Sequence, residues 1–209
     1  MRSKFAAILI GAALAASGAG AATFQGEFWD ADVRLTTPAE ALAVIGSRQA
    51  DATFRSTGID YVRGDVETVD AAVTLGAFLG PDAGSLSGFS STPLTQSVFR
   101  FSGFLDLAAG EQVFDVASDD GFVLTIGGVE IGSSIFRRFR SSTFTADPGA
   151  GPTPFELVFF ENAGRTGIEF LIDGAVAEAV EAPAPIPLPA GLPLLAGALG
   201  LLALSRRRR

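Results

Sequence analysis

Two adjacent carboxylates, Asp119 and Asp120, are the side chains of this sequence that most suggest a chemical site. They lie in the corner Ser118–Gly121, between two runs whose apolar residues alternate with period two, Phe114–Val116 and Phe122–Ile126. This alternation predicts a strand on each side of the corner. Asp is depleted from strand interiors, so we expect the pair at a loop tip that water or a cation can reach. Two carboxylates with nearby carbonyl groups suit a hard cation such as Ca²⁺. The alternative is a hairpin turn with solvated acids, since Asp and Gly dominate turns.

A longer motif surrounds the two aspartates. An aromatic-glycine-aromatic strand precedes a short loop with Gly, and a second strand ends in Ser-Asp-Asp-Gly before an apolar continuation; the matching stretches are Phe101–Leu105, Gly110, Phe114–Leu124 and Gly127–Gly128. In this form the sequence resembles PA14-type domains. In the calcium-dependent lectins of that family a cis peptide joins the paired aspartates, which hold Ca²⁺, and the Ca²⁺ holds a sugar. The resemblance implies an all-β, PA14-like β-sandwich or barrel with one or two short helices, and metal ligands at Asp119 and Asp120.

A second loop, 161–166, separates two apolar runs that predict strands at 155–160 and 167–172. Gly164 favours a hairpin loop here, because glycine readily adopts a positive φ, and a plain hairpin loop is one interpretation. The loop also resembles the second calcium loop of PA14-type lectins, in which an Asn side chain and the carbonyls two and four residues later complete the site. The resemblance implies ligands at Asn162 and at the backbone of Gly164 and Thr166, with Glu161 as a further candidate.

Arginine and phenylalanine alternate in the segment 136–140, where Phe136 and Phe139 interleave with Arg137, Arg138 and Arg140. Arginine suits planar stacking and bidentate contacts, so the segment could contact a sugar or an anion. We take Phe136 and Arg137 as candidate glycan contacts. The alternative is that these arginines pair with surface carboxylates of an acidic protein.

Composition excludes several classes of function. The chain of 209 residues has no Cys and no His, which removes disulfides, thiolate chemistry, imidazole-ligated zinc and Ser-His-Asp hydrolysis. Between the terminal segments lie nine basic and all 23 acidic residues, a net charge of −14. Such a surface repels phosphate, so we expect no nucleic-acid partner. We also expect no enzymatic activity, because no recognisable nucleophile–base or carboxylate pair is present.

The remaining sequence predicts a mainly β domain with short helices. A first strand is predicted within 23–33, and a helix follows with Thr37 as cap, Pro38 at its first position and Glu40 completing a capping box. The spacing in 66–79 slightly favours a helix over a strand and loop. Loops are predicted at 80–96 and 146–154, which are rich in Gly, Pro, Ser and Thr, and a strand at 98–107.

Both ends of the chain predict processing segments around a domain at 23–181. Residues 1–22 have the basic start, apolar centre and small-residue end of a secretory signal peptide. Residues 182–209 combine a proline box, an apolar span and an arginine cluster; the box and cluster residues are Ile186, Pro187, Leu188, Pro189, Ala190, Arg206, Arg207, Arg208 and Arg209.

This tail resembles the PEP-CTERM sorting signals, in their Val-Pro-Leu-Pro-Ala variant, with Ile186 in place of Val. Its apolar span is short against the ~20 residues that a bilayer requires, and an ordinary single-pass anchor is the alternative. The resemblance implies export in a Gram-negative bacterium and transient retention in the inner membrane by a C-terminal apolar helix. An exosortase-type sorting enzyme would then release the protein to the cell surface or matrix.

These expectations define two leading hypotheses. The first is an exported, adhesin-like module that binds a glycan through Ca²⁺. The second is a structural matrix protein whose PA14-like domain does not bind sugar.

Overall fold

The computed structural model describes residues 21–61, 68–89 and 91–184. The predictions for most of the signal peptide and for the proline box, apolar span and arginine cluster lie outside these ranges. The elements in chain order are β1 Phe24–Asp30, α1 Pro38–Ser47, β2 Ala52–Ser56, β3 Val69–Asp70, α2 Leu75–Leu79, the 3₁₀ turn Gly80–Ser85, β4 Ser87–Gly88, β5 Ser97–Leu107, β6 Gln112–Asp119, β7 Gly121–Ile126, β8 Val129–Ser134, β9 Arg140–Ala146, β10 Gly151–Glu161, β11 Arg165–Ile172 and β12 Ala175–Val176.

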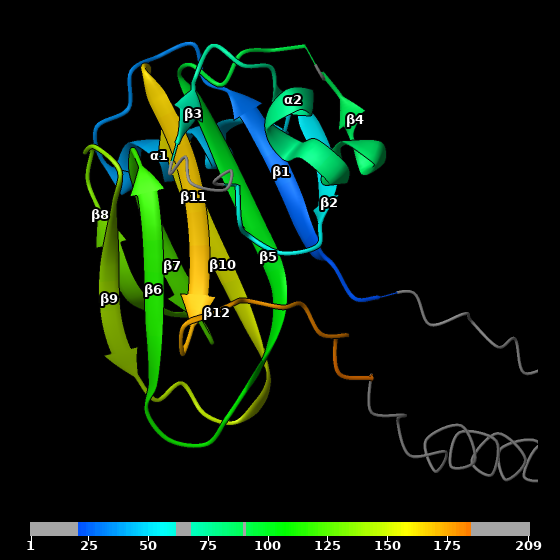
Figure 1. The fold of residues 1–209 in the computed structure, drawn as a ribbon, viewed down its shortest axis with the longest axis vertical. Coiled ribbons are helices and arrows are strands. Elements are labelled where there is room, and N and C mark those ends of the chain that lie inside the picture. The colour runs from blue at the N-terminus through cyan, green and yellow to red at the C-terminus, as the bar shows by residue number, and fades with distance from the viewer. Residues whose placement is uncertain (1–20, 62–67, 90, 185–209) are drawn as a thin grey trace, which may run out of the picture.

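Two antiparallel sheets face each other (Figure 1). One has seven strands in the order β4-β2-β1-β5-β10-β7-β8; the other has five, with β12-β11-β6-β9 in line and β3 paired to β11. The long partners β5 and β10 pair along their whole length, from Gly151 opposite Leu107 to Glu161 opposite Ser97. The expected all-β sandwich with two short helices is confirmed.

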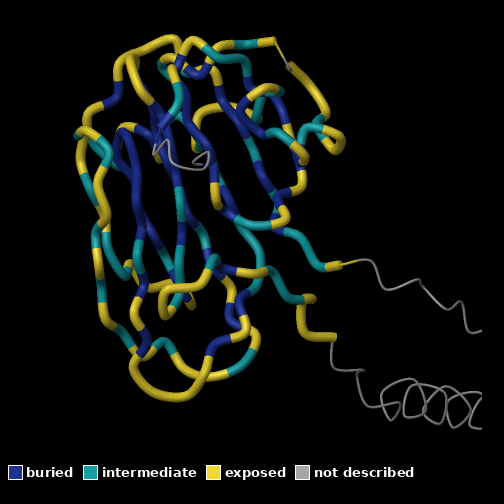
Figure 2. Tube along the Cα trace, viewed as in Figure 1, coloured by how far each residue is buried: buried dark blue, intermediate teal, exposed yellow. Residues whose placement is uncertain are grey.

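The core lies between the sheets and consists largely of phenylalanine. Period-two alternation directs one face of each strand inward, and Figure 2 shows buried segments along the facing strands. Phe99 and Phe101 of β5 have ring centroids 6.2 Å apart, and Phe99 is 5.6 Å from Phe159 of β10. Aromatic pairs at such separations add to the free energy gained by burial.

Helix α1 packs on the outer face of the seven-stranded sheet, where it encloses a second apolar cluster that includes Trp29, Leu35, Ala41 and Phe160. The predicted capping box is confirmed: the Thr37 hydroxyl accepts from the Glu40 amide, and the Glu40 carboxylate accepts from the Thr37 amide. This cap fixes the start of α1. The segment leading into it therefore has a defined path across one end of the sandwich.

Three predictions for the connecting segments need correction. Within the described part of 66–79, β3 comes first and the helix α2 covers only the last five residues, where Thr74 caps it. The expected loop at 80–96 contains the 3₁₀ turn and β4. The loop at 146–154 is shorter than predicted, because β10 begins at Gly151 and tolerates Pro152 and Pro154 within it.

The two corners that carry the candidate ligands are not hairpins, contrary to the local prediction. Strands β6 and β11 belong to the five-stranded sheet, whereas β7 and β10 belong to the seven-stranded sheet. The chain therefore crosses between the sheets at Asp120 and again in 162–164. Period-two patterns identify strands but carry no information about which sheet each strand joins, so sequence alone favoured the shorter-range pairing.

The two ends of the described chain lie near each other, since Ala21 and Ala22 line one surface hollow together with Val180, Glu181 and Ala182. In Figure 1 they leave from the lower half of the domain, while β6 ends and β11 begins at the upper end. Among the described residues, no helix has the length and apolar character needed to cross a membrane.

Candidate metal and ligand site

Strand pairing brings the two crossings together. Asp119, the last residue of β6, lies opposite Gly167 of β11, and Gly121, the first residue of β7, lies opposite Phe160 of β10. The corner at Asp120 and the loop that follows Glu161 must therefore meet at the same end of the sandwich. Residues 40 positions apart in sequence form one site for this reason.

Three carboxylates meet at this point. Asp119, Asp120 and Glu161 have exposed fractions of 9%, 2% and 0%, and each offers an oxygen within 4.8 Å of the others. The peptide bond between Asp119 and Asp120 is cis, as the resemblance implies. The expected solvated turn is thus wrong on burial, although the pairing of the acids at a corner was predicted correctly.

Burial raises the pKa values of all three groups, and repulsion by neighbouring acids adds to this for Glu161 and Asp119. Burial, and then the charges of Asp120 and Asp119, raise the pKa of Glu161 to about 9. Burial and the charge of Asp120 raise the pKa of Asp119 to about 6. Burial also raises the pKa of Asp120, against the hydrogen bonds from Asn162 that lower it. Such a group of carboxylates favours either bound protons or a bound cation.

Glu161 supports the cation over simple protonation. Both of its carboxyl oxygens are buried and make no hydrogen bond of ordinary geometry with the described residues, although the Thr166 hydroxyl and the Asn162 amide lie near enough to lower its pKa. The Thr166 hydroxyl is likewise buried without a hydrogen bond of ordinary geometry. A buried polar atom without a partner is costly and rare in folded proteins. Hard cations such as Ca²⁺ are bound by carboxylate and carbonyl oxygens. The oxygen donors of this site therefore fit Ca²⁺, with Asp119, Asp120 and Glu161 as the carboxylates that would hold it.

Asn162, the single asparagine of the chain, orients the cluster. Its backbone amide and its Nδ2 each donate to Asp120 Oδ2 at 2.9 Å. Nδ2 also donates to the Leu35 carbonyl at 2.7 Å, and Oδ1 accepts from the Leu35 amide at 2.6 Å. The side-chain oxygen that the resemblance assigns to the metal is thus engaged by Leu35, on the segment leading into α1. In this arrangement Asn162 positions Asp120.

The other two loop positions also lie beside the cluster. The Gly164 carbonyl accepts from the Ala71 amide at 2.9 Å, and Gly164 has a φ of +100°. Thr166 is fully buried and pairs with Val69 of β3. Its hydroxyl lies close enough to the Glu161 carboxyl to lower that pKa against the larger effect of burial. Their role as metal ligands stays a prediction.

A cleft of about 720 Å³ opens onto the two aspartates. The loop between β8 and β9 forms one wall, with Phe136, Arg137, Arg138 and Phe139, and the loop after β10 forms the other, with Ala163, Gly164 and Arg165; Thr68 completes the lining. The aromatic ring of Phe136 is 41% exposed. Both candidate glycan contacts, Phe136 and Arg137, therefore line the same cleft as the carboxylates.

Arg137 is held by neutral groups. It donates to the Ser142 hydroxyl, the Arg140 carbonyl and the Ser118 hydroxyl at 2.8, 2.8 and 3.3 Å, and its guanidinium carbon lies 5.5 Å from the centre of the Phe122 ring. Among the described residues, arginine forms ion pairs only at Arg48 and Arg100. The expectation that the 137–140 arginines pair with surface carboxylates is therefore wrong for the described residues.

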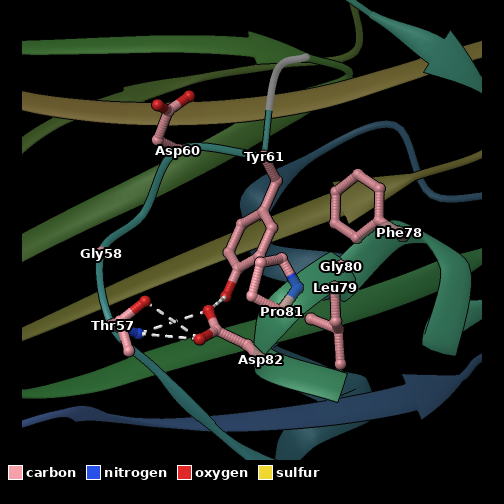
Figure 3. A pocket seen from close by; sticks show the side chains of 9 residues that line it. All are labelled: Thr57, Gly58, Asp60, Tyr61, Phe78, Leu79, Gly80, Pro81 and Asp82. Carbon is pink, nitrogen blue, oxygen red and sulfur yellow. Dashed lines mark hydrogen bonds between the residues drawn. The ribbon is translucent and has the colours of Figure 1, made fainter. Parts of the chain in front are cut away.

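A second cleft, of about 610 Å³, contains a buried acid whose bonding explains it structurally (Figure 3). Asp82 accepts from the Tyr61 hydroxyl at 2.8 Å and from the Thr57 hydroxyl at 3.0 Å, and the Thr57 amide approaches it at 3.3 Å. Burial, and to a smaller degree Asp82, raise the pKa of Tyr61. Both carboxylate oxygens of Asp82 are satisfied, so this residue holds the 56–61 segment in place.

Comparisons with known proteins agree with the fold. No family model matches the sequence, and no curated protein matches it. Among solved structures, the PA14 domain of the MpAFP antifreeze protein superposes with a TM-score of 0.66 at 23% identity, covering 83% of this chain and all of that one. A PA14 sugar-binding domain from an RTX adhesin gives 0.60 at 27% identity, covering 77% and 96%. The A domain of epithelial adhesin 9 from Candida glabrata, solved with Galβ1-3GlcNAc, gives 0.51 at 7% identity, covering 78% and 92%. The fold is that of PA14 domains.

Some residues of the site escape reasoning from sequence. Leu35 contributes to the site only through its backbone amide and carbonyl, which bond to Asn162. A backbone contact of this kind cannot be predicted from the residue type. Arg165 lines the cleft because its guanidinium is held by Thr68, at 2.6 Å from Nε to Oγ1 and 2.8 Å from Nη2 to the carbonyl. Glu161, which the sequence offered only as a further candidate ligand, follows four apolar residues of β10, and an acid is almost never fully buried unless it is paired.

Proposed function

We propose that this chain is an exported, non-catalytic module that binds a glycan through Ca²⁺ held by Asp119, Asp120 and Glu161. The observation that carries the proposal is the buried, unpartnered carboxyl group of Glu161 beside two further buried carboxylates. Three acids at one buried point repel one another unless protons or a cation compensate. Ca²⁺ would supply that compensation and offer remaining coordination positions to vicinal hydroxyl groups. Asn162, with the carbonyls of Gly164 and Thr166, would complete or orient the metal site.

The walls of the cleft suit a sugar. Phe136 presents an exposed ring beside the carboxylates, and an apolar ring face packs against the C–H groups of a pyranose. The backbone amides of the same walls and the guanidinium group of Arg137 supply donors for hydroxyl oxygens. The likeness to a sugar-binding PA14 domain at 27% identity supports this function as well.

The location of the module follows from the two terminal segments. A signal peptide at 1–22 and a PEP-CTERM-like tail would carry the protein across the inner membrane of a Gram-negative bacterium. An exosortase-type enzyme would then release it to the surface or matrix. Strand β6 ends and β11 begins in the upper part of the domain, whereas the described chain ends leave from its lower half (Figure 1).

Calorimetric titration of Ca²⁺ into the purified protein tests the proposal, and the Asp119→Asn/Asp120→Asn variant, titrated in the same way, is the control. Saturable binding that the variant loses, followed by glycan binding that a chelator abolishes, is the expected result. A protein that binds no Ca²⁺ at millimolar concentration contradicts the proposed mechanism. Calcium binding without any glycan on a broad array would instead favour the structural matrix protein, in which the cation only rigidifies the corner.

A further inference from the structure

The cleft concentrates positive charge in an otherwise acidic protein. Nine arginines and no lysine lie between residues 23 and 181, against 23 acids. Three of the nine, Arg137, Arg138 and Arg165, line the cleft that opens onto Asp119 and Asp120. A fourth, Arg34, lies over the exposed Phe136 side chain, with its guanidinium carbon 5.0 Å from the ring centre. None of these four arginines forms an ion pair with an acid among the described residues.

The guanidinium groups are available to a ligand. Arg138 is exposed and makes no hydrogen bond or ion pair with the described part of the chain. Arg165 is exposed on the opposite wall, and Thr68 fixes it through one edge of its guanidinium group. Arg137 lies deeper, where three neutral acceptors orient it and its buried Nε has no hydrogen-bond partner among the described residues. The lining of the cleft thus includes one fixed, half-buried guanidinium group and one exposed guanidinium group on each wall.

This arrangement fits poorly with a neutral sugar alone. Guanidinium groups beside a cation site repel the incoming cation, and a neutral ligand does nothing to relieve that repulsion. A carboxylate can coordinate Ca²⁺ and also accept paired hydrogen bonds from arginine, which suits its planar geometry. A ligand with a carboxylate beside its hydroxyl groups would therefore contact both the metal and the arginines.

On the basis of the proposed function, we infer that the glycan is acidic: the cleft recognises a uronic acid unit, whose carboxylate meets Arg138 and Arg165 while the sugar contacts the bound Ca²⁺. Arg137 contributes a fixed positive charge to the lining of the cleft. The preferred ligand is consequently a carboxylated polysaccharide, and its binding and that of Ca²⁺ strengthen each other, because linkage between two ligands is reciprocal.

The test compares matched sugars that differ only at C6. The methyl glycosides of galactose, glucose and mannose and the corresponding methyl glycosiduronates of the same anomeric form are each titrated into the purified full-length protein at fixed free Ca²⁺ and constant ionic strength. We expect at least one uronate to bind about fivefold or more tightly than its neutral partner, the ratio that a partly exposed charge pair provides. The same uronate should raise the apparent Ca²⁺ affinity by the factor by which Ca²⁺ raises the affinity for the uronate.

Substitution then assigns the preference to the arginines. Arg138→Gln/Arg165→Gln should abolish the uronate preference, leave binding of the neutral sugar within about twofold, and leave binding of Ca²⁺ alone unchanged or tighter. Arg55→Gln, on strand β2 and outside the cleft, is the matched control and should keep the preference. Thermal unfolding of each variant checks that the fold is intact.

The outcomes distinguish failure of this inference from failure of the proposed Ca²⁺-dependent glycan binding. Equal affinity for neutral and acidic sugars, each dependent on Ca²⁺, overturns the inference and leaves the proposed function standing. A preference that persists in the double variant also overturns it. Failure of every sugar to bind in the presence of Ca²⁺ overturns both.

Discussion

The side-chain amide of Asn162 links Asp120 to Leu35: Nδ2 donates to Asp120 Oδ2 at 2.9 Å, while Oδ1 accepts from the Leu35 amide at 2.6 Å. One residue thereby connects the carboxylate cluster to the segment that leads into α1. All three residues are buried, so these bonds are protected from exchange with water. Removing the amide should affect both the stability of the domain and the orientation of Asp120.

Asn162→Ala should lower the free energy of unfolding by about 2–3 kcal/mol, because the buried backbone amide and carbonyl of Leu35 would both lose their hydrogen-bond partner. It should also weaken Ca²⁺ binding, since Asp120 would no longer be held. Urea unfolding followed by the fluorescence of Trp29, the single tryptophan, measures the first effect and calorimetry the second. Unchanged stability in the variant would contradict the bonding described for Asn162.

Glu161→Gln should change the stability of the Ca²⁺-free protein and the binding of Ca²⁺ in opposite directions. The raised pKa of Glu161, about 9, means that the folded protein disfavours its ionised form, so the Ca²⁺-free protein loses stability as pH rises from about 4.5 to about 9. Gln cannot ionise, and the variant should therefore be more stable than the parent in chelator at pH 8, by roughly 2–4 kcal/mol. The stabilisation by added Ca²⁺ should fall sharply in the same variant.

Chemical unfolding of the parent and the variant at pH 5 and pH 8, with and without Ca²⁺, gives the free energy of unfolding of each protein under the four conditions. A variant that is less stable than the parent in chelator at pH 8 would show that Glu161 is satisfied by interactions other than a cation.

Ca²⁺ binding should depend on pH for the same reason. The pKa values of Asp119, about 6, and Glu161, about 9, leave protons on the cluster at neutral pH, and the cation must displace them. Affinity should rise from pH 6 to pH 9, by about tenfold per pH unit for each proton displaced. Titration in two buffers of different ionisation enthalpy counts the released protons. Glu161→Gln is the control and should release about one proton fewer; pH-independent affinity would show that the acids are already ionised.

The sequence predicted much of this site but not how the site is assembled. Asp119, Asp120 and the 161–166 loop were identified from residue types and a motif, because acids at a strand end and a glycine-containing loop leave a local pattern. The crossings between the sheets could not be predicted from the sequence. They depend on the pairing of β6 with β11 and of β7 with β10, and these strands lie far apart in the chain. The capped helix was predicted accurately because Thr37 and Glu40 interact within one turn. Burial of the acids follows from the crossings and was missed with them.

Asp82 provides a contrast, a buried acid with a purely structural role. Asp82→Asn should destabilise the domain by about 1–3 kcal/mol, because the Tyr61 and Thr57 hydroxyls donate to different oxygens of Asp82 and an amide keeps only one of these acceptors. Binding of Ca²⁺ and of sugars should be unchanged in the variant. Tyr61→Phe, which removes one of these donors, should give a smaller loss. Any effect of Asp82→Asn on sugar binding would assign a function to the second cleft (Figure 3).

Gly121 allows the chain to turn from one sheet into the other directly after the two aspartates. A methyl group at this position would lie 2.4 Å from the Phe160 ring and 2.5 Å from the Ser134 carbonyl, and neither the packed ring nor the backbone can move away easily. Gly121→Ala should therefore destabilise the domain by about 1–3 kcal/mol, as overpacking in a core does. It should also displace Asp120 and weaken Ca²⁺ binding. Gly46→Ala is the matched control: the position lies in α1 with no atom within 4 Å of the added carbon, so the change should stabilise the domain by about 0.5–1 kcal/mol. Urea unfolding with Trp29 fluorescence distinguishes the two variants, and equal stability of both would contradict the close packing at the corner.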